Sequence, residues 1–172
     1  MNDERKSASA LPLKCLIIVY SYHHHNTLKI AEEFSKVLKA KIMAPDHVVL
    51  EELQEYDLIG FGAGIDSGRH YKPLLDLVDR LPDIEKKDVF IFSTSAIQGE
   101  RKVKNDHTIL RQKLESKGYS IQGEFSCKGF NTNLFLKYIG GMNKGRPNDE
   151  DIKHANEFAS NLVNMQLNKM HI

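Results

Sequence analysis

Residues 13–27, LKCLIIVYSYHHHNT, decide the fold of this chain. The first half is an apolar run rich in β-branched residues, and it stops at Ser21, where a short polar loop begins. An amphipathic segment starts near Thr27, so a buried strand, a loop rich in hydrogen-bond donors and a helix N-terminus follow one another directly. Because a helix N-terminus presents unpaired N–H groups and the positive end of a dipole, this junction predicts an anion site that suits a phosphate.

The rest of the chain alternates between strand-like and helix-like patterns. Strands are predicted at 13–20, 41–44, 57–63, 89–94 and 119–127, a helical turn at 50–56, and helices at 27–40, 71–81, 105–117 and 148–165. Asn148 is expected to cap the last helix, with Asp151 three residues further on. Strands that alternate with helices indicate an α/β fold with a parallel sheet covered on both faces.

Length and composition predict one domain over 13–172, preceded by a flexible polar tail over 1–12. The net charge of +1 argues against nucleic acid as a partner, and the apolar runs are too short for a membrane span. The first residues do not resemble a signal peptide, which predicts a cytoplasmic location. Cys15 and Cys127 have no metal-binding spacing and are expected to be small core residues.

Three loops are expected at the carboxyl ends of the strands, where open α/β sheets bind their ligands. They are 21–26, 64–70 and 95–100, and all three are rich in small and polar residues. Glycines in and beside these loops allow a close approach of the backbone: Gly62, Gly64, Gly68 and Gly99. Three such loops on one edge predict a ligand wider than a phosphate.

The run His23–His25 admits three readings: phosphate contact by one or two of the rings, a plain polar loop, or a metal site. Adjacent side chains point in different directions and no Cys or carboxylate stands nearby, so a metal is the least favoured. His70 is expected in an exposed loop or near the ligand. The other histidines are expected at the surface: His47, His107, His154 and His171.

Other phosphate-binding loops do not match the residues. The P-loop pattern GxxxxGK[ST] is absent, and no G-x-G-x-x-G follows the first strand. A low-molecular-weight tyrosine phosphatase would need a Cys at the start of this loop and an Arg at its end, and a receiver domain would need carboxylates after its strands. Ser21, Thr27 and Gly64 stand at such positions instead.

With Ser21 and Asn26–Thr27 at the ends of its first loop, the chain resembles the flavodoxin-like family, whose S/T-x-T-G-N-T loop holds the phosphate of FMN. The loop of this chain is one residue longer than the family's loop. The segment GAGIDSGRHY at 62–71 also resembles menaquinone-dependent protoporphyrinogen oxidases of flavodoxin type. The resemblance implies a doubly wound three-layer sandwich with a five-stranded parallel sheet in the order 2-1-3-4-5.

The resemblance also implies a noncovalent FMN site. Ser21, His25, Asn26 and Thr27 are the expected phosphate donors, and Tyr22 and Tyr71 are the nearest aromatic candidates for the flavin faces, since the chain has no Trp. The residues expected to bind the cofactor are Ser21, Tyr22, His23, His24, His25, Asn26, Thr27, Ala63, Gly64, Ile65, Asp66, Gly68, Thr94, Ser95, Ala96 and Gly99.

Three functions are left open. The first is an FMN-binding electron-transfer flavoprotein that serves a redox partner protein or a small-molecule acceptor; a homodimer is also left open. The second is an FMN-dependent oxidoreductase acting on a quinone, a porphyrinogen or a similar small substrate, and the third is a flavin-free interaction module. The segment 128–147 has an apolar middle, which is expected to be buried against the sheet end, the flavin edge or a second subunit.

Overall fold

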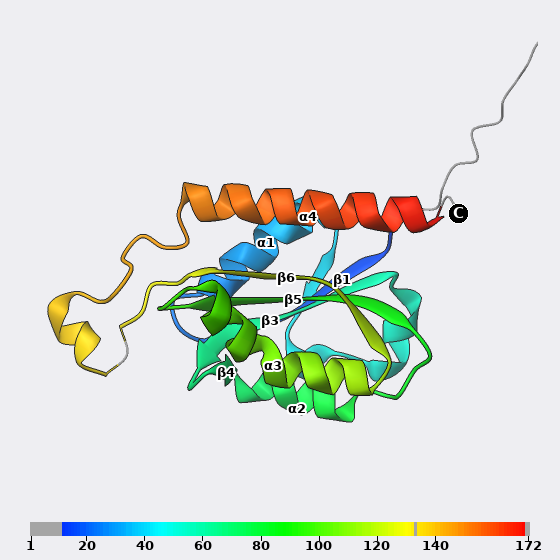
Figure 1. Ribbon diagram of the computed structural model, residues 1–172, viewed down its shortest axis with the longest axis horizontal. Helices are drawn as coiled ribbons and strands as arrows, with labels where there is room; N and C mark the ends of the chain where they lie inside the picture. The colour runs from blue at the N-terminus through cyan, green and yellow to red at the C-terminus, as the bar shows by residue number, and fades with distance from the viewer. Residues whose placement is uncertain (1–11, 133, 171–172) are drawn as a thin grey trace, which may run out of the picture.

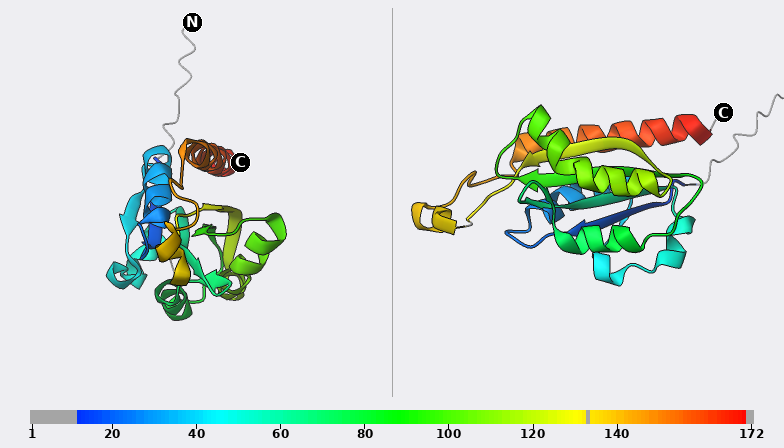
Figure 2. Two further views of the ribbon diagram at one scale, coloured as in Figure 1. Left: turned by 90° about the vertical axis from the view of Figure 1, so that its left-hand side faces the viewer. Right: turned by 60° about the horizontal axis from the view of Figure 1, so that its bottom comes forward.

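A parallel sheet between two layers of helices forms the body of the protein (Figure 1). The structure is a computed structural model that describes residues 12–132 and 134–170. Helices α1 (Asn26–Leu38) and α4 (Asp149–Met170) cover one face, and α2 (Lys72–Arg80) and α3 (Glu100–Ser116) cover the other (Figures 1 and 2). The tail predicted over 1–12 lies outside the described residues except for Pro12.

The long strands are β1 (Cys15–Tyr20), β2 (Lys41–Met43), β3 (Leu58–Asp66), β5 (Lys87–Ser95) and β6 (Tyr119–Lys128). They pair in parallel in the order β2-β1-β3-β5-β6, which is the predicted order 2-1-3-4-5 when the short strand β4 is set aside. β1 pairs on both sides, with Leu16 opposite Lys41 and Ile59. This central position explains why its sequence is apolar without alternation.

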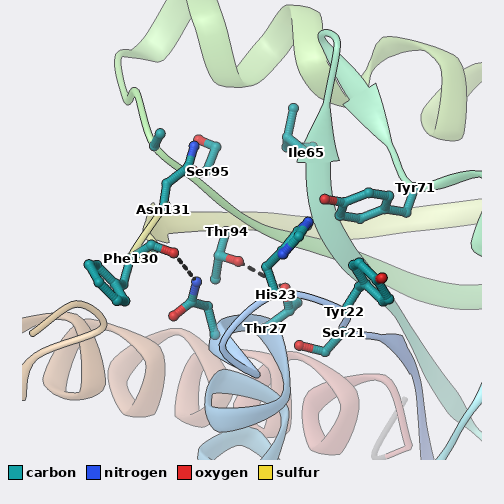
Figure 3. Close-up of a pocket in the computed structure, with 14 residues that line it drawn as sticks. Ser21, Tyr22, His23, Thr27, Ile65, Tyr71, Thr94, Ser95, Phe130 and Asn131 are labelled. Carbon is teal, nitrogen blue, oxygen red and sulfur yellow. Dashed lines mark hydrogen bonds between the residues drawn. The ribbon is translucent and has the colours of Figure 1, made fainter. Parts of the chain in front are cut away.

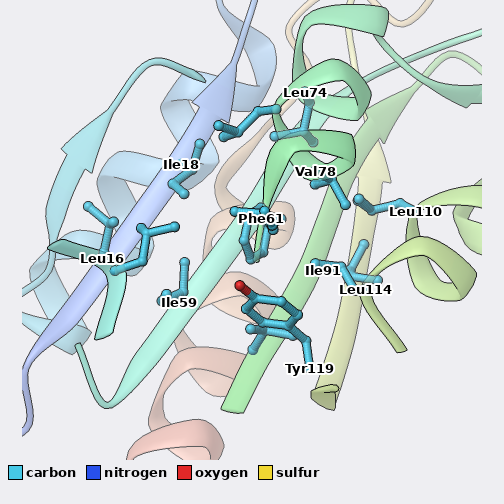
Figure 4. Packing of buried hydrophobic residues seen from close by; sticks show 14 of the residues in the cluster. Leu16, Ile18, Ile59, Phe61, Leu74, Val78, Ile91, Leu110, Leu114 and Tyr119 are labelled. Carbon is cyan, nitrogen blue, oxygen red and sulfur yellow. The ribbon is translucent and has the colours of Figure 1, made fainter. Parts of the chain in front are cut away.

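Each face of the sheet has its own core. On the α2 and α3 face, side chains such as Leu16, Phe61 and Leu110 pack together (Figure 4). On the other face the Phe34 ring lies 5.2–5.6 Å from the rings of four phenylalanines in edge-on or tilted contact: Phe90, Phe92, Phe125 and Phe158. Gly60 and Gly62 on β3 make room for two of them, because a Cβ at either position would overlap the ring of Phe90 or Phe92.

Short 3₁₀ helices η1 (Pro45–His47) and η2 (Leu50–Glu55) connect β2 to β3. The helix predicted to start at Asn105 begins at Glu100 instead, because its first turns are mainly charged and give no apolar period. The predicted cap of α4 is confirmed: Asn148 N–H donates to Asp151 Oδ2 at 2.9 Å, and Asp151 N–H donates to Asn148 Oδ1 at 3.1 Å. Among the described residues, no helix has the length and apolar character that a membrane crossing needs.

The loop predicted at 64–70 is a β-hairpin. β3 continues to Asp66, and the two-residue strand β4 (Arg69–His70) pairs with it antiparallel. Ser67 and Gly68 form the turn with φ values of 51° and 78°, the left-handed pair that a tight hairpin turn requires. The hairpin turns His70 inward, so the expectation of an exposed loop is wrong for this residue.

Residues 129–147, here called the arm, extend beyond the carboxyl end of the sheet (Figures 1 and 2). The arm contains the short helix η3 (Leu134–Ile139), and its two limbs meet at Asn131 and Met142, which exchange backbone hydrogen bonds of 2.9 and 2.7 Å. Tyr138 and Ile139 are 80% and 68% exposed. Burial against the end of the sheet, one of the three places expected for the apolar middle, is therefore wrong for these two side chains, because η3 stands clear of the sheet.

Candidate functional site

A pocket opens at the carboxyl ends of the strands, beside the point where the strand order reverses between β1 and β3 (Figure 3). Four chain segments meet there, following β1, β3, β5 and β6. Open α/β sheets bind their ligands at this place. The lining residues are Ser21, Tyr22, His23, Asn26, Thr27, Gly64, Ile65, Tyr71, Thr94, Ser95, Ala96, Gly129, Phe130 and Asn131.

The first loop turns sharply into α1. His24 and His25 both have left-handed backbones, with φ of 53° and 52°, and His25 is the residue before the helix. Ser21 Oγ accepts a 3.2 Å hydrogen bond from Leu28 N–H, which satisfies one of the free donors at the helix start. The first turn of α1, which lies wholly within the described residues, carries no acidic side chain. The positive end of the helix therefore faces the pocket without a neutralising carboxylate.

Asn26 ties the start of α1 to the root of the arm. Its Nδ2 donates to the carbonyl oxygen of Phe130 at 2.8 Å, and its side chain is buried. A Cβ on Gly129 would lie 2.9 Å from Asn26 Nδ2, so only glycine allows this approach. Asn26 Oδ1 is one of two buried side-chain polar atoms without a hydrogen-bond partner among the described residues. It is an acceptor that a hydroxyl group of a ligand could satisfy.

Hydroxyl groups form the floor of the pocket. Thr27 Oγ1 and Thr94 Oγ1 are 2.8 Å apart and buried, and they join α1 to the end of β5 (Figure 3). Ser95 Oγ donates to the carbonyl oxygen of Ile97 at 2.7 Å and accepts from Gln98 Nε2 at 2.7 Å. These bonds hold the segment after β5 in a tight turn at the edge of the pocket.

Aromatic side chains stand on the opposite side. The Tyr71 backbone N–H donates to the carbonyl oxygen of Gly64 at 3.2 Å, and a Cβ on Gly64 would lie 2.8 Å from the Tyr71 ring. Burial raises the pKa of the Tyr71 phenol, which therefore stays a hydrogen-bond donor at neutral pH. Tyr22 is 65% exposed, and its ring meets His23 edge-on at 4.6 Å between ring centroids. Both tyrosines line the pocket (Figure 3).

The structure brings most of the predicted site residues together in this pocket: Ser21, Tyr22, His23, Asn26, Thr27, Gly64, Ile65, Thr94, Ser95 and Ala96. The others lie outside its lining. Ala63 packs in the core, Asp66 and Gly68 are on the exposed hairpin, and Gly99 precedes α3.

His24 and His25 are exposed beside the pocket. The His24 ring lies 4.5 Å from the Phe130 ring, and its Nε2 lies 2.8 Å from Thr132 Oγ1. In the part of the chain that the structure describes, no three His, Cys, Asp or Glu side chains form a group that could hold a metal ion.

Gly129, Phe130 and Asn131 were not among the residues expected to bind the cofactor, although the flavin edge was one of the places expected for the segment 128–147. They follow the last strand and so leave the sheet at the same carboxyl edge as the other loops.

The histidines outside the first loop divide into two groups. Exposure, expected for His107 and as one alternative for His70, was wrong for both, since His70 and His107 are 1% and 0% exposed. His47 and His154 are exposed as expected, and His171 lies outside the described residues.

The two cysteines are buried as expected, and burial raises the pKa of both thiols.

The fold and the pocket define an α/β protein with a pocket at the switch point of a parallel sheet. The family model described as a flavodoxin domain matches residues 17–129. An uncharacterised protein of Methanocaldococcus jannaschii is 44% identical over 151 residues, which cover 88% of this chain and 99% of that protein. The chain belongs to the flavodoxin domain family.

Solved structures agree in fold. A flavodoxin from the domain Archaea has a TM-score of 0.65 at 16% identity and covers 90% of this chain and 99% of its own. A flavodoxin of Streptococcus pneumoniae TIGR4 has the same score and identity, with 88% and 99% covered. A flavodoxin of Fusobacterium nucleatum, solved bound to flavin mononucleotide, has a TM-score of 0.60 at 13% identity, with 89% and 99% covered.

Proposed function

We propose that this protein binds FMN noncovalently and works as an electron-transfer flavoprotein. The observation that carries the proposal is the convergence of four segments on one pocket. The start of α1, which has no acidic side chain in its first turn, lines the pocket together with Gly64–Ile65, Thr94–Ala96 and Gly129–Asn131. When bound, FMN would supply one- and two-electron redox chemistry, and the protein would position it and tune its potential.

The pocket fits the anionic end of FMN. The start of α1 has no acidic residue in its first turn, and Ser21, His23 and Thr27 stand around it. Phosphate at such a helix end receives backbone N–H donors and the favourable end of the helix dipole. His24 and His25 are exposed beside this end. The proposal includes contact of one or both of these rings with the phosphate.

The pocket also fits the polyhydroxy chain and the ring. The unpartnered acceptor Asn26 Oδ1 suits a ribityl hydroxyl, and the Thr27 and Thr94 hydroxyls lie close by. Gly64 and the segment Ser95–Ala96 offer backbone groups at the ring edge, and Tyr71 and Tyr22 offer aromatic surface. With Tyr22 largely exposed, the outer edge of the ring would remain accessible to a partner, as electron transfer requires.

Calorimetric titration of the purified protein with FMN, riboflavin and FAD tests the proposal. FMN should bind more tightly than riboflavin, because the phosphate adds charge-assisted hydrogen bonds, and more tightly than FAD, because the lining offers no adenine site. Photoreduction of the loaded protein followed by transfer to a redox dye should then show reversible electron transfer. Equal affinity for FMN and riboflavin would contradict the placement of the phosphate, and failure to bind any flavin would contradict the function.

Steady-state assays separate the carrier from an FMN-dependent oxidoreductase. A carrier should show little turnover with NAD(P)H and a quinone unless a reductase protein is added. Fast turnover of such a pair by the loaded protein alone would favour the enzyme, with a redox partner protein no longer needed.

A further inference from the structure

A buried polar cluster lies on the α3 side of β5 and β6, behind the candidate site. His107 on α3 is fully buried between two partners: its Nε2 lies 2.8 Å from Ser93 Oγ, and its Nδ1 lies 2.8 Å from Glu124 Oε2. Arg111 clamps the same carboxylate through Nε at 2.5 Å and NH2 at 2.7 Å. The proposed function uses none of these side chains.

The cluster is joined to the candidate site by further hydrogen bonds. Ser93 Oγ donates to Ser126 Oγ at 2.9 Å, and Gln98 Nε2 donates to Ser126 Oγ at 3.0 Å. The same Gln98 Nε2 lies 2.7 Å from Ser95 Oγ, and Ser95 lines the pocket. Ser126 is partly exposed in a surface groove. His107 is therefore linked through hydroxyl groups both to solvent and to the turn that edges the site.

This geometry satisfies His107 in two protonation states. Burial alone would raise the pKa of Glu124, but the hydrogen bonds from His107 and Arg111 lower it to about 2, so Glu124 is a carboxylate that accepts from Nδ1–H. With Nε2 unprotonated, the Ser93 hydroxyl donates to it instead of to Ser126. With Nε2 protonated, it donates to Ser93, which donates to Ser126. The two states differ only in the direction of the hydroxyl hydrogens.

His70 lies next to His107, but its hydrogen-bond partners satisfy only one protonation state. Its ring lies 4.9 Å from the His107 ring, its Nε2 donates to the carbonyl oxygen of Phe92 at 3.1 Å, and its Nδ1 is buried without a partner. A second proton on His70 would have no acceptor, and burial, with His107 beside it, lowers its pKa to about 3. The groups that face His107 are thus the carboxylate Glu124 on β6, the guanidinium Arg111 on its own helix, and neutral His70 on β4.

We propose that His107 stores a proton that compensates the negative charge of a reduced flavin, with Ser126 and Ser93 as the path for the proton. The inference rests on the proposed function. One electron reaches the flavin and one proton from water binds His107 Nε2; the proton passes by O–H and N–H exchange along the two hydroxyls, and no other bond is made or broken. Negative charge at the site favours the imidazolium, which Glu124 already holds in place.

Nitrogen NMR of the histidine rings gives a readout that does not depend on turnover. In the protein without flavin, Ser93→Ala should slow exchange of the His107 ring hydrogen with water. In the FMN-loaded protein at one fixed pH, reduction with dithionite should raise the doubly protonated fraction of His107 several-fold. An unchanged fraction on reduction would overturn the inference.

The pH dependence of the midpoint potential gives the second readout. Wild-type protein should show a steeper slope than His107→Gln, with the difference approaching a tenfold change in the equilibrium per pH unit, which is about 59 mV for one electron. His70→Gln is the matched control and should keep the wild-type slope. Equal slopes in wild type, His107→Gln and Ser93→Ala would overturn the inference while leaving FMN binding intact; absence of flavin binding would overturn both proposals.

Discussion

At the scale of single residues, Asn26 and Thr27 connect the start of α1 to the arm and to the end of β5. Asn26 bonds to Phe130 in the arm, and Thr27 bonds to Thr94 at the end of β5. Each side chain is buried and comes from the first turn of α1, so the helix start is held in place by contacts to both. A change at either residue should therefore disturb the pocket that these contacts shape.

Thr27→Val tests which part of FMN this hydroxyl meets. Losing one charge-assisted hydrogen bond to phosphate weakens binding by about 1.5–3 kcal/mol, so FMN affinity should fall roughly tenfold to a hundredfold, while riboflavin affinity stays within about twofold. Calorimetry with both ligands measures this. Thr108→Val, which removes a hydroxyl that bonds to the Lys104 carbonyl oxygen on α3, is the control. Equal losses for FMN and riboflavin would place Thr27 away from the phosphate.

His70 should make stability depend on pH. Its pKa in the folded protein, about 3, lies below the ordinary value of 6.5, so the unfolded chain binds the proton first as pH falls. The free energy of unfolding should therefore decrease below pH 6.5, by at most about 1.4 kcal/mol per pH unit. Glu124 adds its own loss only below its ordinary value of 4.5, which leaves pH 6 to 5 for the test.

The measurement is urea unfolding of wild type and His70→Gln across this range. Glutamine can still donate to the Phe92 carbonyl oxygen but does not titrate, so the variant should show a shallower decrease. His47→Gln, at an exposed position, should behave as wild type. A slope that is the same in His70→Gln and wild type would show that His70 is not the titrating group.

At the scale of elements, the site is formed by residues at the ends of helices and strands. The limb of the arm that follows η3 is held beside the turn after β5, because Asn143 Nδ2 donates to the Ala96 carbonyl oxygen at 2.7 Å. The far end of the arm is anchored by the cap of α4, where Arg146 NH1 bonds to Asp151 Oδ1 at 2.8 Å. The arm is thus held at both ends even though η3 stands in solvent.

Asn148→Ala should destabilise the protein through the cap of α4. The change removes the acceptor for Asp151 N–H and one contact of Arg146, and losing such a cap costs about 0.5–2 kcal/mol. Urea denaturation measures the difference. Asn161→Ala, at an exposed position inside the same helix, is the control and should change stability by less than about 0.5 kcal/mol. An equal effect of both changes would argue against the cap.

At the scale of the whole molecule, the sheet assembles the site from distant parts of the sequence. β1, β3, β5 and β6 run parallel, so the segments that follow them all leave at one edge (Figure 1). The two cores beneath this edge are well packed, with Ile17, Phe34, Phe61 and Phe92 fully buried. Ligand binding at this edge should therefore stabilise the fold as a unit.

FMN should raise the melting temperature. At a free concentration a hundred times the dissociation constant, a ligand that binds only the folded state adds about 2.7 kcal/mol, which corresponds to about 5–10 °C for a chain of this size. Differential scanning calorimetry with increasing FMN measures the shift. AMP, which offers a phosphate without a flavin, should give a smaller one. An unchanged melting temperature at saturating FMN would contradict binding to the folded protein.

The sequence by itself determined the features that depend on local pattern. The apolar run before Ser21, the alternation of strands and helices and the Asn148 cap are properties of neighbouring residues, and the structure confirms them. The family resemblance supplied the strand order, which the structure also bears out. The loops after the strands could be named in advance because parallel strands end at one edge.

Only the tertiary structure decided which polar residues are buried and what they meet. His107 and Glu124 lie 17 residues apart, and Asn26 and Phe130 lie 104 apart, so no local period reveals either pair. The hairpin that buries His70 and the exposure of Tyr138 likewise depend on where distant segments pack. A histidine is polar enough for the surface and small enough for the interior, and its place is set by the partners that the fold provides.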